Sequence, residues 1–98
     1  MEITKNMNGT NLEIALAGRL DTMTAPELEQ ELKDSMDSAE TLTLDFSKLE
    51  YISSAGLRVL LSAHKAMTPK GGMKVTNVNE IVKEVFEVTG FSDILTIE

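Results

Sequence analysis

Two neighbouring serines are the residues of this chain best placed to do chemistry. They follow the apolar pair Tyr51-Ile52 and precede the small pair Ala55-Gly56, where an apolar periodicity predicts the start of a helix. A serine at a helix start ordinarily serves as an N-cap worth about 1 kcal/mol, which explains either Ser53 or Ser54 but not both. The free N–H groups and the dipole of a helix N-terminus also accept an added phosphate. The pattern therefore indicates a phosphorylation site at one of the two hydroxyls.

The small pair behind the serines also needs an explanation. Glycine inside a helix costs about 1 kcal/mol relative to alanine, so Gly56 is an unusual choice for a helix start. A small residue permits close approach of another backbone or of a ligand. We therefore expect Ala55 and Gly56 to be required small, because both the preceding strand and a partner surface approach the helix there.

The remaining reactive side chains do not form a catalytic set. His64 is the only histidine, the chain has no cysteine to pair with it, and its helical spacing predicts a packing or surface residue. Acidic residues such as Asp45 and Glu50 are expected to be solvated. The glycines form no phosphate-binding motif, and Gly71-Gly72 reads as a turn. The sequence therefore predicts no catalytic residue, no metal site and no cofactor.

Length and charge narrow the class of protein. The 98 residues fit a single domain, 1–98. Sixteen acidic and nine basic residues give a net charge of −7, which disfavours direct binding to nucleic acid or to an anionic membrane. The start of the chain lacks the apolar run of a signal peptide, no segment approaches the length of a membrane span, and the absence of cysteine is compatible with a reducing compartment. We expect a cytoplasmic protein.

The elements that must position the serines alternate between strands and helices. Apolar alternation predicts strands over 2–7, 12–16, 41–46, 73–77 and 94–97, the first two joined by a hairpin at Asn8-Gly9. Helices are predicted from Thr24 to about Ser38, from Ser53 to just before Pro69, and from the 77–80 segment to Gly90. This order predicts an α/β domain: a mixed, mainly parallel sheet of four to five strands with three helices packed against it.

The sequence predicts capping boxes for two of the three helices and an apolar stripe for each. Thr24 with Glu27, and Asn77 with Glu80, have the spacing of capping boxes. The stripes expected to face the core are Leu28, Leu32 and Met36 in the first helix, Leu57, Leu60, Leu61, His64 and Met67 in the second, and Ile81, Val82, Val85 and Phe86 in the third.

The stretch DFSKLEYISSAGLRVLL resembles the central motif of bacterial anti-sigma factor antagonists, the STAS family. In that motif an Asp or Ser, a Ser, a small residue, Gly and Leu follow an aromatic-apolar pair. AGRLDTMTAPELEQEL resembles the family's second strand, loop and first helix, and VNEIVKEVFEVTGFSDILTIE resembles its third helix and last strand. Nearly the whole chain is covered in order. This chain has Ser53 where Asp is frequent in the family, and Ala55 where Ser or Thr is frequent.

The resemblance implies the location of the functional site. The family's phosphorylated serine lies two places before the motif glycine, which corresponds to Ser54 and Gly56, and Asp21 matches the loop acid beside it at the kinase contact. A loop-end acid has few core neighbours, so we expect Asp21 to contribute to that contact more than to stability. The implied partner-binding residues are Asp21, Thr22, Ser53, Ser54, Ala55, Gly56, Leu57 and Arg58.

The resemblance also implies a function without catalysis. An unmodified family member binds an anti-sigma factor that is also a serine kinase and so frees a sigma factor. The kinase then phosphorylates the antagonist and releases it, and a serine phosphatase resets the cycle. Two alternatives remain: a STAS adaptor in a lipid-transport assembly or signalling scaffold without sigma control, and a small-molecule-binding or enzymatic domain, for which the sequence offers no catalytic groups.

Overall fold

The computed structural model describes residues 1–98 as one five-stranded sheet with three helices. The strands are β1 (Glu2–Asn8), β2 (Asn11–Leu20), β3 (Thr41–Ile52), β4 (Met73–Thr76) and β5 (Thr96–Ile97). The helices are α1 (Ala25–Ser35), α2 (Ser54–Met67) and α3 (Glu80–Thr89), with short 3-10 turns η1 (Met36–Ser38) and η2 (Phe91–Asp93). The strand order is β1-β2-β3-β4-β5, in which only the β1–β2 pair is antiparallel. The predicted α/β class and mainly parallel sheet are confirmed.

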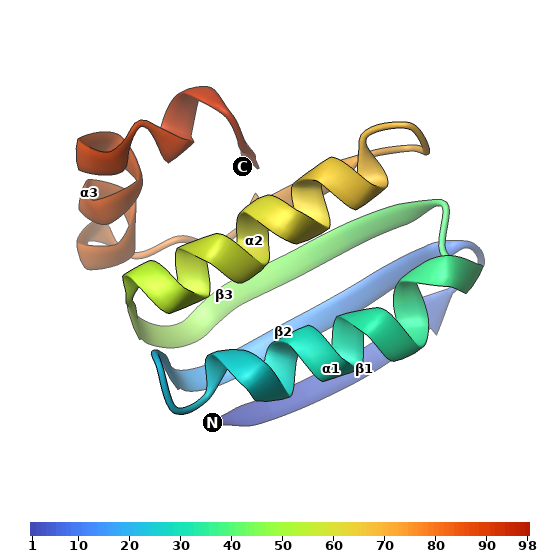
Figure 1. Ribbon diagram of the computed structural model, residues 1–98, viewed down its shortest axis with the longest axis horizontal. Coiled ribbons are helices and arrows are strands. Elements are labelled where there is room, and N and C mark those ends of the chain that lie inside the picture. Colours follow the sequence, from blue (N-terminus) through green and yellow to red (C-terminus); the bar gives the residue numbers. More distant parts are fainter.

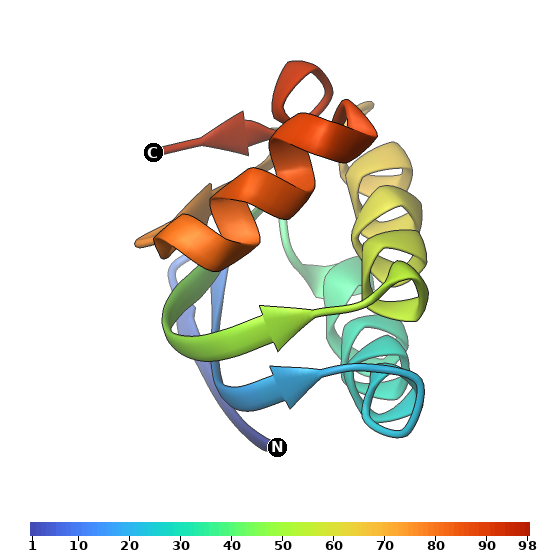
Figure 2. The same cartoon turned by 90° about the vertical axis from the view of Figure 1, so that its left-hand side faces the viewer.

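The helices cover one face of the sheet. α1 and α2 lie side by side across it, and α3 lies across the end of the sheet where β3 runs into α2 (Figures 1 and 2). On β3 the buried side chains Leu42, Leu44 and Phe46 face the helices, and the Phe46 ring lies 6.4 Å from that of Phe86 in α3. The alternate β3 positions, among them Thr43, are only half-buried, because no helix covers the other face. Such alternation is typical of a sheet with one solvated face.

β3 is longer than the sequence predicts. The expected strand ends at Phe46, but pairing with β2 continues as far as Ile52, with register shifts at Ala15/Ala17 and Gly18/Arg19 in β2. These irregularities interrupt the two-residue alternation, so the polar step after Phe46 reads as a strand end although the backbone remains extended. The hairpin turn also moves by one residue, since Asn8 is paired and Gly9, with φ 66°, opens the loop.

The predicted capping box of the first helix is wrong. Thr24 is the N-cap of α1, but its side chain makes no capping bond. Its hydroxyl instead donates to the Arg19 carbonyl at 2.7 Å and accepts from the Asp21 N–H at 2.9 Å. Thr24 therefore closes the β2–α1 loop and does not cap the helix with Glu27.

The cap of the third helix lies two residues later than predicted. The Asn79 side chain accepts a hydrogen bond from the Val82 N–H at 2.8 Å, and Asn77 lies in the left-handed region with φ 57°. Asn77 instead follows β4 directly, and its amide donates to the Asp45 carboxylate at 3.0 Å. The predicted stop at Gly90 is confirmed, since this residue has φ 82° at the C-cap.

The predicted apolar stripes are mostly buried. Leu28 and Leu32 of α1 and Leu57, Leu60 and Met67 of α2 are in the core, while Met36, Leu61 and His64 lie at its margin. The buried face of α2 is thus rotated toward Gly56, Val59 and Ala63. In α3, Val82 and Phe86 are buried and Val85 is half-buried, but Ile81 is 60% exposed, because only a narrow face of this end-lying helix meets the core.

Gly56 provides a test of the packing between α2 and the sheet. A Cβ at this position would lie 2.8 Å from Leu20 Cγ and 2.9 Å from Ile52 Cγ1, and both leucine and isoleucine are fully buried. We expect Gly56→Ala to lower the free energy of unfolding in urea by roughly 1–2 kcal/mol, because overpacking costs about 1–3 kcal/mol and exceeds the helix preference for alanine. Gly56→Leu should be worse. A stabilised Gly56→Ala protein would contradict this close packing.

Candidate functional site

The ends of β2 and β3 bring the two halves of the candidate site together. Leu20 and Ile52, the last residues of these parallel strands, are register partners, and the Ser53 N–H donates to the Leu20 carbonyl at 2.9 Å. Both strands therefore leave the sheet at the same edge, which Figure 2 views from the side of the two arrowheads. This pairing sets the loop that begins at Asp21 beside the helix that begins at Ser54.

The two serines lie in different environments. Ser54 is the first residue of α2 and is exposed. Ser53 is the N-cap in extended conformation, and its Oγ is buried without a hydrogen-bond partner, while its carbonyl accepts from the Leu57 N–H at 2.9 Å. The first N–H groups of a helix have no intrahelical partner, and in α2 no side chain of the N-cap residue accepts from them either. Of the two hydroxyls, only that of Ser54 is open to another protein.

The predicted partner-binding residues divide into a surface set and a core set. A groove of about 300 Å³ between α1 and α2 is lined by Thr22, Ala25, Pro26, Glu29, Ala55, Arg58, Val59 and Ser62. It brings Thr22 of the β2–α1 loop together with Ala55 and Arg58 of α2. Gly56 and Leu57 of the same helix are buried and do not line the groove, so their contribution to any contact is to hold the helix start in place.

Asp21 has a structural role that the sequence did not reveal. Its Oδ1 accepts hydrogen bonds from the N–H groups of Met23 at 3.0 Å and Thr24 at 3.2 Å, and from the Thr24 hydroxyl at 3.3 Å. These bonds hold the turn that leads into α1. These hydrogen bonds are local, because an aspartate can bond to its own backbone two and three residues on, and the expectation that Asp21 has few core neighbours stays a prediction.

The surroundings of Asp21 keep its carboxylate ionised. Desolvation alone would raise the pKa of Asp21, but the hydrogen bonds from Thr24 and Met23 and the charge of Arg19 outweigh it and hold the pKa below its ordinary value. Arg19 Nε lies 3.8 Å from Asp21 Oδ2, and its guanidinium stacks 4.4 Å from the centre of the Tyr51 ring. The site thus carries the negative charge of Asp21, and the cation paired with it, Arg19, also contacts the Tyr51 ring.

Met23 is a surface feature that the sequence analysis missed. It is 82% exposed, at the tip of the turn that Asp21 organises. An exposed methionine offers a flexible apolar contact for another protein. Met23 lies between Asp21 and Thr24, which hold the turn from either side. This position in the sequence could have identified it as an exposed residue.

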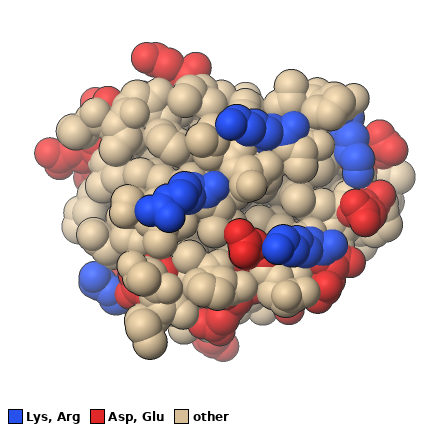
Figure 3. All heavy atoms as spheres, viewed as in Figure 1, with Lys and Arg blue, Asp and Glu red and all other residues tan.

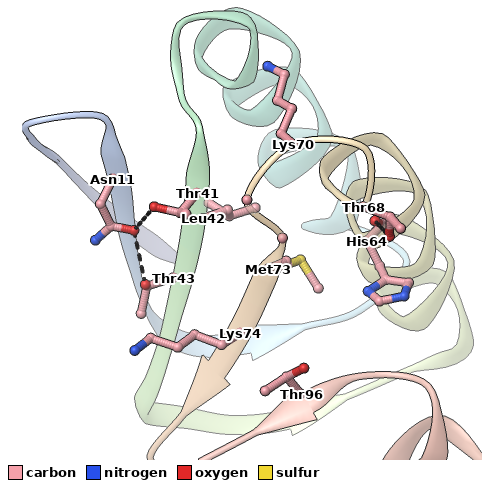
Figure 4. Close-up of a pocket in the computed structure, with 12 residues that line it drawn as sticks. Asn11, Thr41, Leu42, Thr43, His64, Thr68, Lys70, Met73, Lys74 and Thr96 are labelled. Atoms are coloured by element: carbon pink, nitrogen blue, oxygen red, sulfur yellow. Dashed lines mark hydrogen bonds between the residues drawn. The ribbon is translucent and has the colours of Figure 1, made fainter.

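The largest depression, of about 650 Å³, lies elsewhere, at the opposite ends of β3 and β4 (Figure 4). Several of its polar side chains already have hydrogen-bond partners within the protein. Asn11 Oδ1 accepts from the hydroxyls of Thr41 at 2.7 Å and Thr43 at 3.3 Å, and Lys70 Nζ donates to the carbonyls of Met36 and Ala39. His64 lines it with Nδ1 buried and unpartnered, but no second catalytic group accompanies it. This depression does not have the composition of an active site.

The charged side chains form neither a cluster that could hold a metal ion nor a basic area on the face that carries α1 and α2. No group of three or more His, Asp or Glu side chains is arranged to hold a metal ion. On the face that carries α1 and α2, the Lys and Arg side chains stand apart among acidic and uncharged atoms, without a continuous basic area (Figure 3). None of the helices has the length and apolar character needed to cross a membrane.

Comparison with known proteins identifies the family. The family model described as "Mlab, STAS domain" matches residues 3–96. The chain is also 35% identical, over 99% of its length and 85% of the relative's, to a Bordetella bronchiseptica protein named "Putative anti-sigma factor antagonist BtrV". This chain belongs to the STAS-domain family of anti-sigma factor antagonists.

Further relatives agree with this assignment. This STAS-family chain is 26% identical to the "Anti-sigma-B factor antagonist" of Bacillus subtilis, over 99% of the chain and 90% of that protein. Its fold matches the crystal structure of an anti-sigma factor antagonist from Mycobacterium paratuberculosis with a TM-score of 0.89 at 23% identity, covering 98% of this chain and 83% of that one. The recognised family and its α/β fold are both confirmed.

The dual character of Asp21 in this STAS domain can be tested with two substitutions. Asp21→Ala removes the acceptor of the Met23 and Thr24 N–H groups and should lower the melting temperature by several degrees. Asp21→Asn keeps an oxygen acceptor while removing the charge, so it should lose much less. Thermal unfolding followed by circular dichroism at neutral pH measures both, and an unchanged melting temperature for Asp21→Ala would contradict the structural role.

The same pair of proteins gives a pH test. Because the folded pKa of Asp21 is lowered, the stabilisation from its charge is present above the unfolded pKa and is lost as pH falls through the folded value. The difference in stability between the wild type and Asp21→Asn should therefore shrink on acidification. A difference that grows at low pH would contradict the direction of this shift.

Proposed function

We propose that this protein is the switchable partner of an anti-sigma factor that is also a serine kinase. The unphosphorylated form binds this kinase and frees a sigma factor, and phosphorylation at Ser54 ends the complex. Membership of the anti-sigma factor antagonist family supports the first part. The single observation that carries the second is the exposure of Ser54 beside the buried hydroxyl of Ser53.

The docking surface that we propose spans both sides of the α1–α2 groove. Thr22 and Met23 supply the loop side, and Ser54, Ala55 and Arg58 supply the helix side. Met23 is the apolar anchor, since flexible, exposed methionines suit protein interfaces. Asp21 contributes its charge and fixes the turn that presents Met23. The start of α2 is held in place by Ser53, Gly56 and Leu57, which support the docking surface without forming its exposed part.

Phosphorylation acts at this surface through electrostatics. A phosphate adds about −1.5 to −2 charges at neutral pH. At the start of α2 the free domain tolerates this charge, because unpaired N–H groups and the positive end of the helix dipole lie there. In the complex the phosphate is desolvated close to the ionised Asp21, and an unpaired buried charge costs roughly 2–5 kcal/mol of binding energy. Release therefore requires no unfolding of the domain.

The chain itself is substrate and ligand in this cycle and performs no catalysis. The kinase brings ATP, and a serine phosphatase removes the phosphate to restore the binding form. We place this cycle in the cytoplasm, where ATP and the transcription machinery are found.

An adaptor role without sigma control is the second candidate. The family model that matches residues 3–96 is described as "Mlab, STAS domain", a description that does not mention sigma control. Affinity capture with the unmodified protein from its own host, followed by mass spectrometry, separates the two roles. A small ATP-binding kinase supports the antagonist role, whereas recovery of a transporter or a scaffold supports the adaptor role.

Phosphosite mapping tests the proposed switch. Incubation of the wild type with the captured kinase and ATP should increase the intact mass by one phosphate, and peptide mapping should assign it to Ser54. Ser54→Ala should abolish the modification and still bind the kinase. Ser53→Ala is the matched control: it removes a buried, unpartnered hydroxyl, so folding and phosphorylation should both persist. Modification at Ser53, or none in the wild type, would contradict the proposal.

A further inference from the structure

Ser54 and Arg58 lie one turn apart on the solvent-facing side of α2. Both side chains are exposed, while Gly56, Leu57 and Val59 between and beside them are buried. Residues at i and i+4 of a helix have Cβ atoms about 6 Å apart, so their side chains can meet. A group attached to the Ser54 oxygen is therefore within reach of the long Arg58 side chain.

Arg58 has no ion-pair partner in the unmodified protein. It makes no ion pair or hydrogen bond with another side chain, although it lines the same groove as Glu29. Glu29 is engaged with Lys33 at 3.8 Å. The other arginine of the chain, Arg19, is already paired with Asp21. Arg58 is thus a free cation beside the proposed phosphosite.

We propose that Arg58 is the intramolecular counter-ion of the phosphate on Ser54. The planar guanidinium fork matches phosphate oxygens and forms charge-assisted hydrogen bonds that are stronger than neutral ones. The i to i+4 order, with the anion on the N-terminal side, is also the favourable orientation on a helix. This inference rests on the proposed function, in which Ser54 is the phosphorylated residue.

The pairing adds a second element to the switch. In the unmodified protein Arg58 is available to a partner, and after phosphorylation it is turned back toward Ser54. Phosphorylation therefore adds negative charge to the docking surface and also withdraws its free cation. The phosphate is stabilised in the free domain by a contact that docking must break.

The experiment uses full-length protein with phosphoserine incorporated at position 54 during translation, so that no kinase is needed. Phosphorus NMR titration should give a second phosphate pKa lower by roughly 0.3–0.7 units in the wild type than in Arg58→Gln, an estimate from helical ion pairs strengthened by a phosphate partner. Lys65→Gln is the matched control. Lys65 is also exposed on α2 and unpaired, but lies eleven residues, about 16 Å, from Ser54.

Stability measurements complete a double-mutant cycle. Arg58→Gln should lower the melting temperature of the phosphorylated protein by about 2–5 °C more than that of the unmodified protein, and Arg58→Lys should restore part of the loss. High salt should reduce the difference.

Equal phosphate pKa values in Arg58→Gln and Lys65→Gln, with no extra loss of stability in the phosphorylated protein, would overturn the pairing. That result would leave the proposed kinase reaction intact. Conversely, absence of phosphorylation by the captured kinase would contradict the proposed function, whereas the pairing would still be measurable on the translated phosphoprotein.

Discussion

The hydrogen bond from the Ser53 N–H to the Leu20 carbonyl closes the parallel pairing of β2 and β3, and the geometry of the whole site depends on this pairing. It makes the two strands end at the same level. After β2 the backbone turns through the loop that Asp21 holds, and after β3 it enters α2 with Ser54 at its first position. A slip of one residue would move Leu20 and Ile52 out of the core, so burial fixes the register and with it the relation between loop and helix.

The central motif divides its residues between stability and recognition. Gly56 allows α2 to lie directly on Leu20 and Ile52, and no larger residue has room there. The exposed positions of the same turn, Ser54 and Arg58, are free of that packing and therefore available to a partner. In the function that we propose, this division allows a phosphate to be added to Ser54 without disturbing the core. A rigid helix start also presents the Ser54 hydroxyl in one fixed place, which would suit recognition by the kinase that we propose.

The sequence predicted what depends on periodicity and missed what depends on tertiary hydrogen bonds. The order of elements, the parallel sheet and most core residues followed from apolar spacing. The two capping boxes did not, because Thr24 bonds to the Arg19 carbonyl and Asn77 bonds to Asp45, partners that helix-capping rules do not consider. The distinction between the two serines likewise depends on burial, which spacing alone cannot give. The structural role of Asp21 required the conformation of its own turn.

In the switch that we propose, charge added at an exposed, rigid helix start ends binding while the domain stays folded. Isothermal titration calorimetry of the purified partner kinase against the unmodified and the Ser54-phosphorylated protein tests this claim most directly, with circular dichroism of both forms. We expect superimposable spectra and a loss of affinity on the order of thirtyfold to several thousandfold, corresponding to roughly 2–5 kcal/mol. Equal affinities for the two forms, or loss of the native spectrum on phosphorylation, would contradict it.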